Sequence, residues 1–298
     1  YRHPLHLGDN VEVLTQVERV GNTSVTLAQK IAKVGSDGAA AQARVVIVFT
    51  DAKIRLSEDA LERFVDYFRD ASVGAVRSVD QIVGQEGGEG AYVRYEMWLR
   101  SIESNFSTVI GLSGSCFAVR RDIAADMRTD IPSDFALLLA ARARGLSGVH
   151  APDIVGTYQA VATHEAEFQR KVRTVLRGIT TLFACKEVMN WKEYGSFSWQ
   201  IISHKLCRWL VPFAFIIACL GLIVGGGGTT IVVLQLCFVL FLALAGIGFF
   251  NEDFRDKWYC KLPLFFLIVN AGVAVAWYHF LSGKRSVSWN PSEKGKLA

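Results

Sequence analysis

The sequence of 298 residues holds only six cysteines and no Cys-x-x-Cys pair. Two of the six, Cys219 and Cys237, lie inside apolar runs. We therefore expect buried or membrane-embedded thiols rather than a disulfide framework or a zinc site. A large excess of charge is also lacking, because the formal net charge is only +4. The basic residues gather between Gln169 and Arg208, which favours an anionic membrane face or an anionic ligand over duplex nucleic acid.

Long apolar runs are absent from the first 200 residues or so, which have the balance of a globular protein. Three such runs follow, at 209–224, 230–250 and 262–281. Each is close to the ~20 residues that a membrane-spanning helix needs. We therefore predict a cytoplasmic α/β domain at 1–165, amphipathic interfacial helices at 166–208, three transmembrane helices at 209–281 and a polar tail at 282–298.

The basic residues beside the apolar runs predict the orientation in the membrane. Lys205 and Arg208 precede the first run, whereas the loop between the first two runs has no Lys or Arg. The positive-inside rule then places residues 1–208 in the cytoplasm, as expected for a protein of the cytoplasmic (inner) membrane. Three crossings would put the C-terminal tail outside, although it carries Lys284, Arg285, Lys294 and Lys296. Either the tail is tolerated there or one run is re-entrant.

The segment at 45–55 is the strongest local signal in the first part of the chain. Val45 to Phe49 are apolar without a break, which predicts a strand buried on both faces, as in a parallel sheet. The run stops at Thr50 and Asp51, and ligands of open α/β sheets bind at that end of a strand. Asp51 is a candidate ligand-binding residue, with a simple turn-capping role as the alternative.

Further elements follow in alternation. We predict a weak strand at 11–15, helices at 25–34 and 60–68, a strand at 73–76, a helix at 92–106, and a Gly/Ser-rich turn and strand at 110–119. A helix at 136–144, with Asp134 in its first turn and Gly145 as its C-cap, precedes a strand at 149–155. The alternation of strands and helices predicts a parallel sheet with right-handed crossovers.

Several segments resemble, in order, parts of the membrane-bound family 2 glycosyltransferases, which include the cellulose, chitin, hyaluronan and poly-N-acetylglucosamine synthases. Residues 48–53 (Val-Phe-Thr-Asp-Ala-Lys) resemble the metal-binding turn, and 95–103 the helix before the acceptor region. Residues 111–121 resemble the turn and strand that line the acceptor pocket, 133–135 the acidic pair that holds the base, 168–173 the basic helix near the diphosphate, and 203–213 the start of the membrane region. The resemblance implies a GT-A-type, mostly parallel sheet flanked by helices, incomplete at its N-terminus, followed by an α-helical transmembrane region.

The resemblance also implies an activity. A sugar would pass with inversion from a nucleotide-sugar donor, a UDP-sugar, to a growing glycan or a lipid-linked acceptor. Asp134 would be the base, and Asp51 would ligate Mg2+ or Mn2+. The implied phosphate-binding residues are Lys53, Arg170 and Arg173, and the implied acceptor-binding residues are Gly111, Ser113 and Gly114. Membrane lipids are the other expected partners, and nucleic acid is not expected.

Three departures from the family pattern favour an alternative. Lys53 stands where the family has Asp or Asn, Ser133 replaces the first acid of the pair, and residues 1–20 do not supply the strands that grip the uridine. The alternative is a non-catalytic scaffold or partner subunit of a polysaccharide-synthesis machine. Each of these residues also has an ordinary structural interpretation: Asp134 stabilises a helix start, Arg170 and Arg173 contact lipid headgroups, and Glu96 and Glu103 are solvated helix charges.

Overall fold

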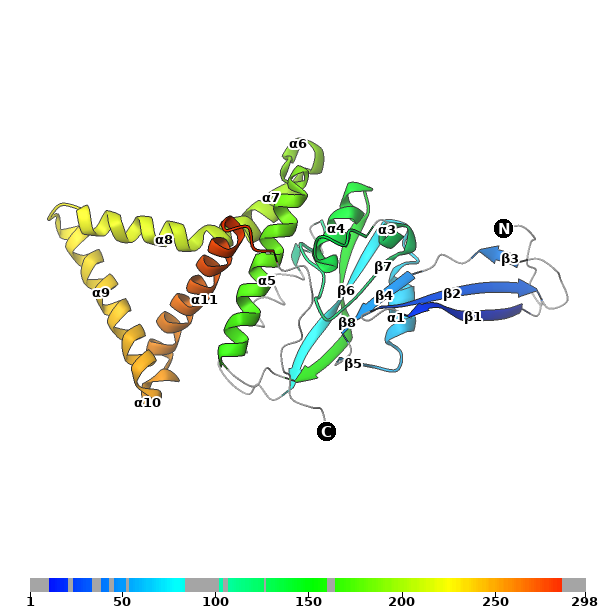
Figure 1. Cartoon of the computed structure of the whole chain (residues 1–298), viewed down its shortest axis with the longest axis horizontal. Coiled ribbons are helices and arrows are strands. Elements are labelled where there is room, and N and C mark those ends of the chain that lie inside the picture. Colours follow the sequence, from blue (N-terminus) through cyan, green and yellow to red (C-terminus); the bar gives the residue numbers. More distant parts are fainter. Residues whose placement is uncertain are drawn as a thin grey trace. The chain divides into compact units, whose positions relative to one another are not determined.

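The computed structural model describes residues 11–20, 24–33, 39–42, 46–51, 54–83, 102–103, 107–125, 127–159 and 164–285 (Figure 1). The chain divides into two compact units. The first holds the chain up to Ala160 together with Cys185–Ser198, and the second holds Val161–Ala184 and Trp199–Lys294.

A mixed eight-stranded sheet forms the centre of the first unit. The strands are β1 (Val11–Val20), β2 (Ser24–Lys33), β3 (Ala39–Gln42), β4 (Val46–Thr50), β5 (Arg55–Leu56), β6 (Val73–Val83), β7 (Cys116–Arg120) and β8 (Ser147–Gln159). Their order is β1-β2-β4-β7-β6-β8-β5, and β3 pairs with β2. Among the described pairings, β6–β8 is parallel and the others are antiparallel. The α/β class is confirmed, but the prediction that the sheet is mostly parallel is wrong.

Burial on both faces of the sheet explains that error. On β7, Phe117 and Val119 enter a core shared with α4, whereas Cys116 and Ala118 enter a second core shared with α1. The partner strand β4 alternates in the same way, and the rings of Phe49 and Phe117 stack at 4.7 Å between centroids. Covered faces give an unbroken apolar run whichever way the neighbouring strands point, so such a run does not report strand direction.

The predicted helix at 25–34 is also wrong, because β2 occupies Ser24–Lys33 and pairs along its length with β1. The apolar residues Val25, Leu27 and Ile31 fit a period of two as well as the helical spacing. A tertiary partner decides such a case, and β1 supplies one: Val20 pairs with Val25 and Val11 with Lys33.

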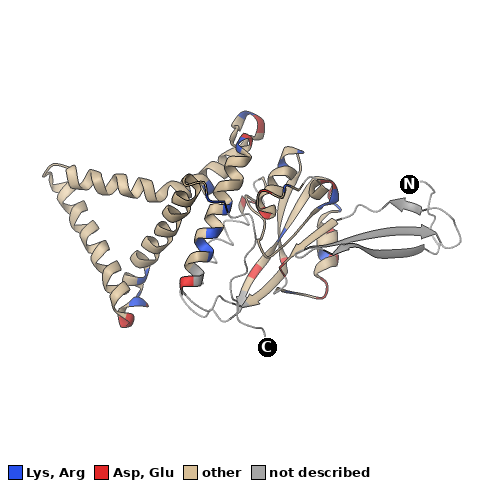
Figure 2. Cartoon of the chain, in the orientation of Figure 1, with Lys and Arg blue, Asp and Glu red and all other residues tan. Residues whose placement is uncertain are grey.

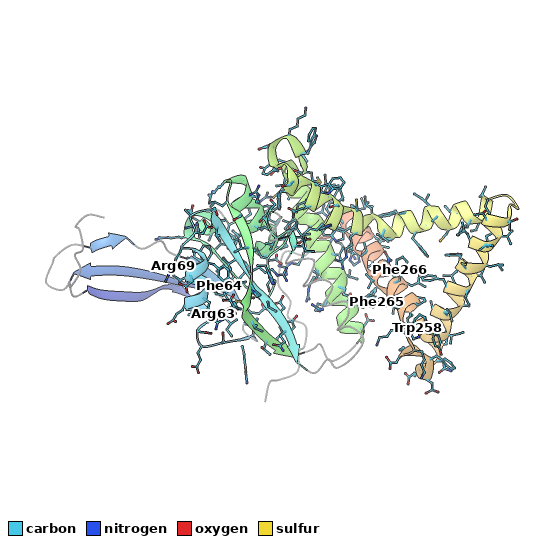
Figure 3. All side chains as sticks on the ribbon, turned by 180° about the vertical axis from the view of Figure 1, so that it is seen from behind. Arg63, Phe64, Arg69, Trp258, Phe265 and Phe266 are labelled. Carbon is cyan, nitrogen blue, oxygen red and sulfur yellow. The ribbon has the colours of Figure 1, made fainter. Side chains whose placement is uncertain are left out.

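The helices of the first unit agree better with the predictions. They are α1 (Ala60–Tyr67), α3 (Arg121–Ala125), α4 (Ser133–Ala143), the 3-10 turn η1 (Lys186–Met189) and α6 (Trp191–Tyr194). Helix α1 buries Ala60, Phe64 and Phe68 at helical spacing against the sheet (Figure 3). Helix α4 ends in a Schellman motif: the Leu146 N–H donates to the Ala141 carbonyl at 3.0 Å, and Gly145 takes the left-handed conformation at φ 74°. Gly145 is therefore confirmed as the C-cap glycine.

The second unit is helical. It contains α5 (His164–Ala184), the π-turn η2 (Ile202–Leu206), α8 (Cys207–Val224), α9 (Thr229–Phe250), α10 (Glu252–Arg255) and α11 (Trp258–Leu281), and α7 (Ser196–Ile201) joins the two units. Three helical segments are long and apolar enough to cross a membrane: Ser196–Val224, Thr229–Phe250 and Trp258–Leu281. This confirms the predicted C-terminal region of three long apolar helices.

Candidate active site

The turn before β7 is the part of the first unit around which the predicted site residues gather. The backbone N–H of Asp51, at the end of β4, donates to the Ser115 carbonyl at 2.8 Å. Thr50, one residue earlier, pairs with Cys116 at the start of β7. Because β4 and β7 are adjacent strands, the end of one lies beside the start of the other. The backbone of Asp51 is thereby held next to Ser115.

Asp134, which follows the turn in the sequence, lies beside the same turn. It lies in the first turn of α4, where the Phe135 N–H donates to its Oδ1 at 2.9 Å. A Cβ placed on Gly114 would lie 3.6 Å from Asp134 Oδ2, and no other heavy atom outside the neighbouring residues would come within 4 Å. The structure therefore brings Asp134 and the backbone of Asp51 to one turn, and their functional roles there stay predictions.

Asp80 on β6 is a third carboxylate at this turn, and the sequence analysis missed it. It accepts hydrogen bonds from the hydroxyls of Ser113, at 2.7 Å, and Ser115. Arg77 lies three residues before Asp80 on the same strand. Its guanidinium lies 3.8 Å from the Asp80 carboxylate and donates to the Gly111 carbonyl at 3.1 Å. The Arg77 side chain is nearly buried. Together Arg77 and Asp80 hold both ends of the 111–115 turn.

The sequence indicates that Arg77 and Asp80 need polar partners, but it does not indicate which residues these are. Charged residues at Arg77 and Asp80 follow the apolar stretch 73–76, and the predicted strand stopped before them. The observed β6 continues to Val83. A charged pair inside a strand that is buried on both faces requires polar partners, and the serines of the turn are those partners.

Two further residues differ from their sequence-based interpretation. Glu103, expected to be a solvated helix charge, is only 3% exposed. Arg120, in the segment that resembles the acceptor-pocket lining, is also buried and donates to the Val73 carbonyl at 2.6 Å and the Asp70 carbonyl at 2.7 Å. Arg120 thus joins β7 to the connection between α1 and β6, which is a structural role.

The remaining predicted residues are not placed at this turn. Lys53 and Glu96 lie outside the described residues. Arg170 and Arg173 lie on α5 in the second compact unit, so their part in phosphate binding stays a prediction. Gly111, Ser113 and Gly114 form the turn itself, and their contact with an acceptor likewise stays a prediction.

The carboxylates near the turn suit a hard divalent cation whose remaining coordination positions are filled by substrate oxygens. In the part of the chain that the structure describes, no group of three or more His, Cys, Asp or Glu side chains could hold a metal ion. Mg2+ needs fewer protein ligands when substrate phosphates are present, since it is commonly held by one or two carboxylates plus phosphate oxygens. Asp51 fits that arrangement as a single carboxylate ligand.

A cavity of about 210 Å³ in the first unit is separate from this turn. Its lining is mainly apolar, with Met127, Leu139 and Val188 together with Arg128 and Cys185. None of the predicted site residues lines it. A nucleotide diphosphate needs several polar partners, so this cavity is unsuited to the donor.

Comparisons with known proteins support the fold. No family model matches the chain, and no curated protein sequence matches it. The structure is similar to that of the mannosyltransferase PcManGT from Pyrobaculum calidifontis, solved in complex with GDP-Man and Mn2+, with a TM-score of 0.59. The two chains share 18% sequence identity over 85% of this chain and 69% of that one. The chain therefore has a glycosyltransferase fold followed by a helical region with three long apolar helices.

Proposed function

We propose that the protein is a membrane-bound glycosyltransferase that transfers a sugar, with inversion, from a nucleotide-sugar donor to a growing glycan or a lipid-linked acceptor. The observation that carries the proposal is the convergence of Asp51 and Asp134 on the 111–115 turn. An inverting transfer needs one carboxylate to take a proton from the acceptor and a separate site for the leaving diphosphate. Two carboxylates on either side of one turn meet both requirements.

Asp134 is assigned the role of the base. Its carboxylate takes the proton of the acceptor hydroxyl while that oxygen attacks the anomeric carbon of the donor, and the bond from this carbon to the diphosphate breaks. The hydrogen bond from the Phe135 N–H orients the carboxyl group. The turn at Ser113 and Gly114 is assigned to the acceptor because it faces Asp134.

Asp51 is assigned to the donor. A divalent cation held by this carboxylate, Mg2+ or Mn2+, supplies positive charge beside the leaving diphosphate. The hydrogen bond to Ser115 fixes the backbone at Asp51 beside the turn that is assigned to the acceptor. Lys53, Arg170 and Arg173 are assigned to the donor phosphates from their positions in the sequence, and Arg suits bidentate phosphate contact.

Turnover of a nucleotide sugar by the purified full-length protein tests the proposal. The protein in detergent or lipid is incubated with UDP-sugars and with GDP-Man, with Mg2+ or Mn2+, and the release of nucleoside diphosphate is measured. We expect release that depends on the cation and that falls by at least about 100-fold in Asp134→Asn and Asp51→Asn. Asp130→Asn is the matched control, because Asp130 is an exposed acid near α4 that pairs with Arg128.

Two outcomes would overturn the assignment. Turnover by Asp134→Asn at the normal rate would remove Asp134 as the base. Absence of turnover with every donor, in a folded protein that also does not bind a nucleotide sugar, would favour the non-catalytic partner subunit. The replacement of an acid by Ser133 is the observation that keeps this second function in view.

A further inference from the structure

The first turns of α8 and the last turns of α11 occupy one corner of the second unit. The indole N–H of Trp277 donates to the Trp209 carbonyl at 2.9 Å, and the rings of Phe213 and Trp277 meet edge to face at 5.8 Å. Trp209 is 8% exposed. Helices α8, α9 and α11 form the sides of a triangle that closes at this contact (Figure 1).

A closed path limits the number of membrane crossings. The chain runs through α8, α9 and α11 in succession and returns to the level at which it started. A path that begins and ends at the same level of a bilayer crosses it an even number of times. The predicted three crossings therefore do not fit this contact, and two of the three helices remain as candidates.

The charges at the corners indicate which two helices cross. The corner between α8 and α9, Gly225 to Thr230, has no charged side chain. The corner between α9 and α11 contains α10 and is highly charged, and the closing corner is basic (Figure 2). The charged residues of these two corners are Glu252, Asp253, Arg255, Asp256, Lys257 and Lys261 in the first, and Lys205, Arg208, Lys284 and Arg285 in the second. Since charges avoid the hydrocarbon core, both charged corners belong at a membrane surface.

Helices α8 and α9 suit a lipid environment on all sides. Neither has a charged side chain after Arg208, and large apolar side chains are exposed around both, including Ile217, Ile223, Leu236 and Leu240. Only 11% of the most apolar window of each is buried within the protein. Their lengths, 18 and 22 residues, correspond to roughly 27 and 33 Å, close to the ~30 Å of the hydrocarbon core.

Helix α11 differs because a basic amphipathic helix lies along it. Val172 and Leu176 of α5 pack against Ala276, and Gly272 lies next to Phe168 and Val172. The Lys171 ammonium lies 5.2 Å from the centre of the Phe265 ring (Figure 3). The share of the apolar window of α11 that is buried is 28%, well above that of the other two helices.

The polar residues of α5 fix the level of this helix pair. Gln169, Arg170, Arg173 and Arg177 lie on the same helix as the apolar stripe that contacts α11 (Figure 2). A helix with this many basic residues is expensive to place in the hydrocarbon core but is typical of the headgroup region. Ala271, Tyr278 and Leu281 are exposed and lie on the face of α11 away from Gly272 and Ala276, where acyl chains at the interface would cover them.

We propose that α8 and α9 cross the bilayer as a hairpin with the Gly225–Gly228 turn on the far side, and that α11 lies along the near surface beside α5. The C-terminal tail then emerges on the side from which α8 starts. The basic tail and the basic flank before α8 share one side, as the positive-inside rule requires. The partner of the exposed face of α11 is the lipid surface.

Labelling of single added cysteines in the full-length protein tests this arrangement. Sealed membrane vesicles of each orientation are treated with a membrane-impermeant maleimide, and labels beyond those on the six native thiols are counted by mass. The variants are E62C on α1, G227C, D256C and K284C. The chain enters α8 directly from the first unit, so E62C marks the side on which α8 starts.

We expect E62C, D256C and K284C to be labelled from one face and G227C from the other. Labelling of K284C from the face opposite E62C would restore three crossings and overturn the proposal. Labelling of D256C from the face opposite E62C would show that α11 crosses, and a G227C that is labelled from neither face would show a re-entrant turn. Both results would also overturn it. Short epitope tags inserted at the same positions and probed with antibody give an independent measurement if a cysteine variant does not fold.

Discussion

Asp51 and Ser115 are joined by a 2.8 Å hydrogen bond from backbone N–H to carbonyl, across the end of β4 and the turn before β7. The bond ties an acid that follows one strand to a turn more than sixty residues later. Asp134 faces the preceding residue of the turn, Gly114, from the start of α4. Backbone structure therefore places Asp51 and the start of α4 on either side of one turn.

The first prediction concerns Gly114. In Gly114→Ala the new Cβ would lie 3.6 Å from Asp134 Oδ2, an ordinary van der Waals contact, so folding should be unchanged. In Gly114→Leu the larger side chain would occupy the space in front of Asp134. We expect turnover by the leucine variant to fall by about 100-fold, because small displacements at a reacting centre have effects of that size. Nucleoside diphosphate release measures the effect.

Thermal unfolding of the same two variants is the control for that experiment. Both should unfold within a few degrees of the natural protein, since Gly114 is exposed and its φ is not in the left-handed region. Full activity in Gly114→Leu would argue against an acceptor site between this turn and Asp134.

The second prediction concerns Asp80 as a positioning residue. Asp80→Ala removes the acceptor for the hydroxyls of Ser113 and Ser115, and Ser113 is buried. The two hydroxyls, 2.9 Å apart, can still bond to each other, so one hydroxyl donor loses its carboxylate acceptor, and a hydrogen bond to a charged group is worth about 1.5–3 kcal/mol. We expect a lower melting temperature and a higher KM for the acceptor, with a smaller change in kcat, because the turn and not the reacting carboxylate is disturbed.

Asp80→Asn separates geometry from charge. The amide oxygen still accepts from one or both serines, while the ion pair with Arg77 is lost. This variant should lie between the natural protein and Asp80→Ala in KM. Asp66→Ala, which removes an exposed acid paired with Arg69 on α1, should change neither KM nor melting temperature appreciably. A positioning role would be contradicted if kcat fell as much as KM rose, or if Asp80→Asn and Asp80→Ala raised KM equally.

Local sequence signals predicted the elements that depend on short-range chemistry. The strand that ends at Asp51, helix α1, the start of α4 at Asp134 and its glycine C-cap at Gly145 all follow from patterns within about ten residues. The Schellman motif at Gly145 needs only a left-handed glycine and a following apolar residue, and Leu146 supplies the second.

Strand direction and long-range polar partners could not be predicted in the same way. Val46–Thr50 is apolar because both faces of the sheet are covered, and this holds beside antiparallel neighbours as well. The residues of β2 match both helical and strand periods, so only pairing with β1 decides between them. Asp80 acquires its role from serines more than thirty positions away, and no local pattern reports that contact.

The third prediction concerns the corner where α5 meets α8. A Cβ on Gly178 would lie 2.7 and 2.9 Å from ring atoms of Trp209, which is too close without movement of the indole. Overpacking of this kind costs about 1–3 kcal/mol, against a gain of up to ~1 kcal/mol from replacing glycine in a helix. Gly178→Ala should therefore unfold at a lower temperature in detergent micelles.

Gly221→Ala on α8 is the matched control, because a Cβ there meets no atom within 4 Å. It gains helix propensity without a clash, so its melting temperature should be equal or higher. A double variant Gly178→Ala with Trp209→Phe should recover part of the loss, since the smaller ring leaves space for the methyl group. Equal stability of the two alanine variants would mean that Trp209 does not pack on Gly178.

The last prediction concerns pH and Cys116, which lies beside the candidate site at the start of β7. Burial raises the pKa of this thiol to about 12 from its ordinary value near 9. Between these values the folded protein keeps the proton while the unfolded chain releases it, so the free energy of unfolding falls as pH rises above about 9. The slope from this one group approaches ~1.4 kcal/mol per pH unit. Burial and the hydrogen bond to Asp153 raise the pKa of Tyr67 as well, which adds a loss of the same sign at higher pH.

Melting temperatures between pH 8 and 10.5 should therefore fall less steeply in Cys116→Ala than in the natural protein, whereas Cys207→Ala, at an exposed thiol, should keep the natural slope. Parallel curves for all three proteins would show that Cys116 ionises as readily in the folded state as in the unfolded one.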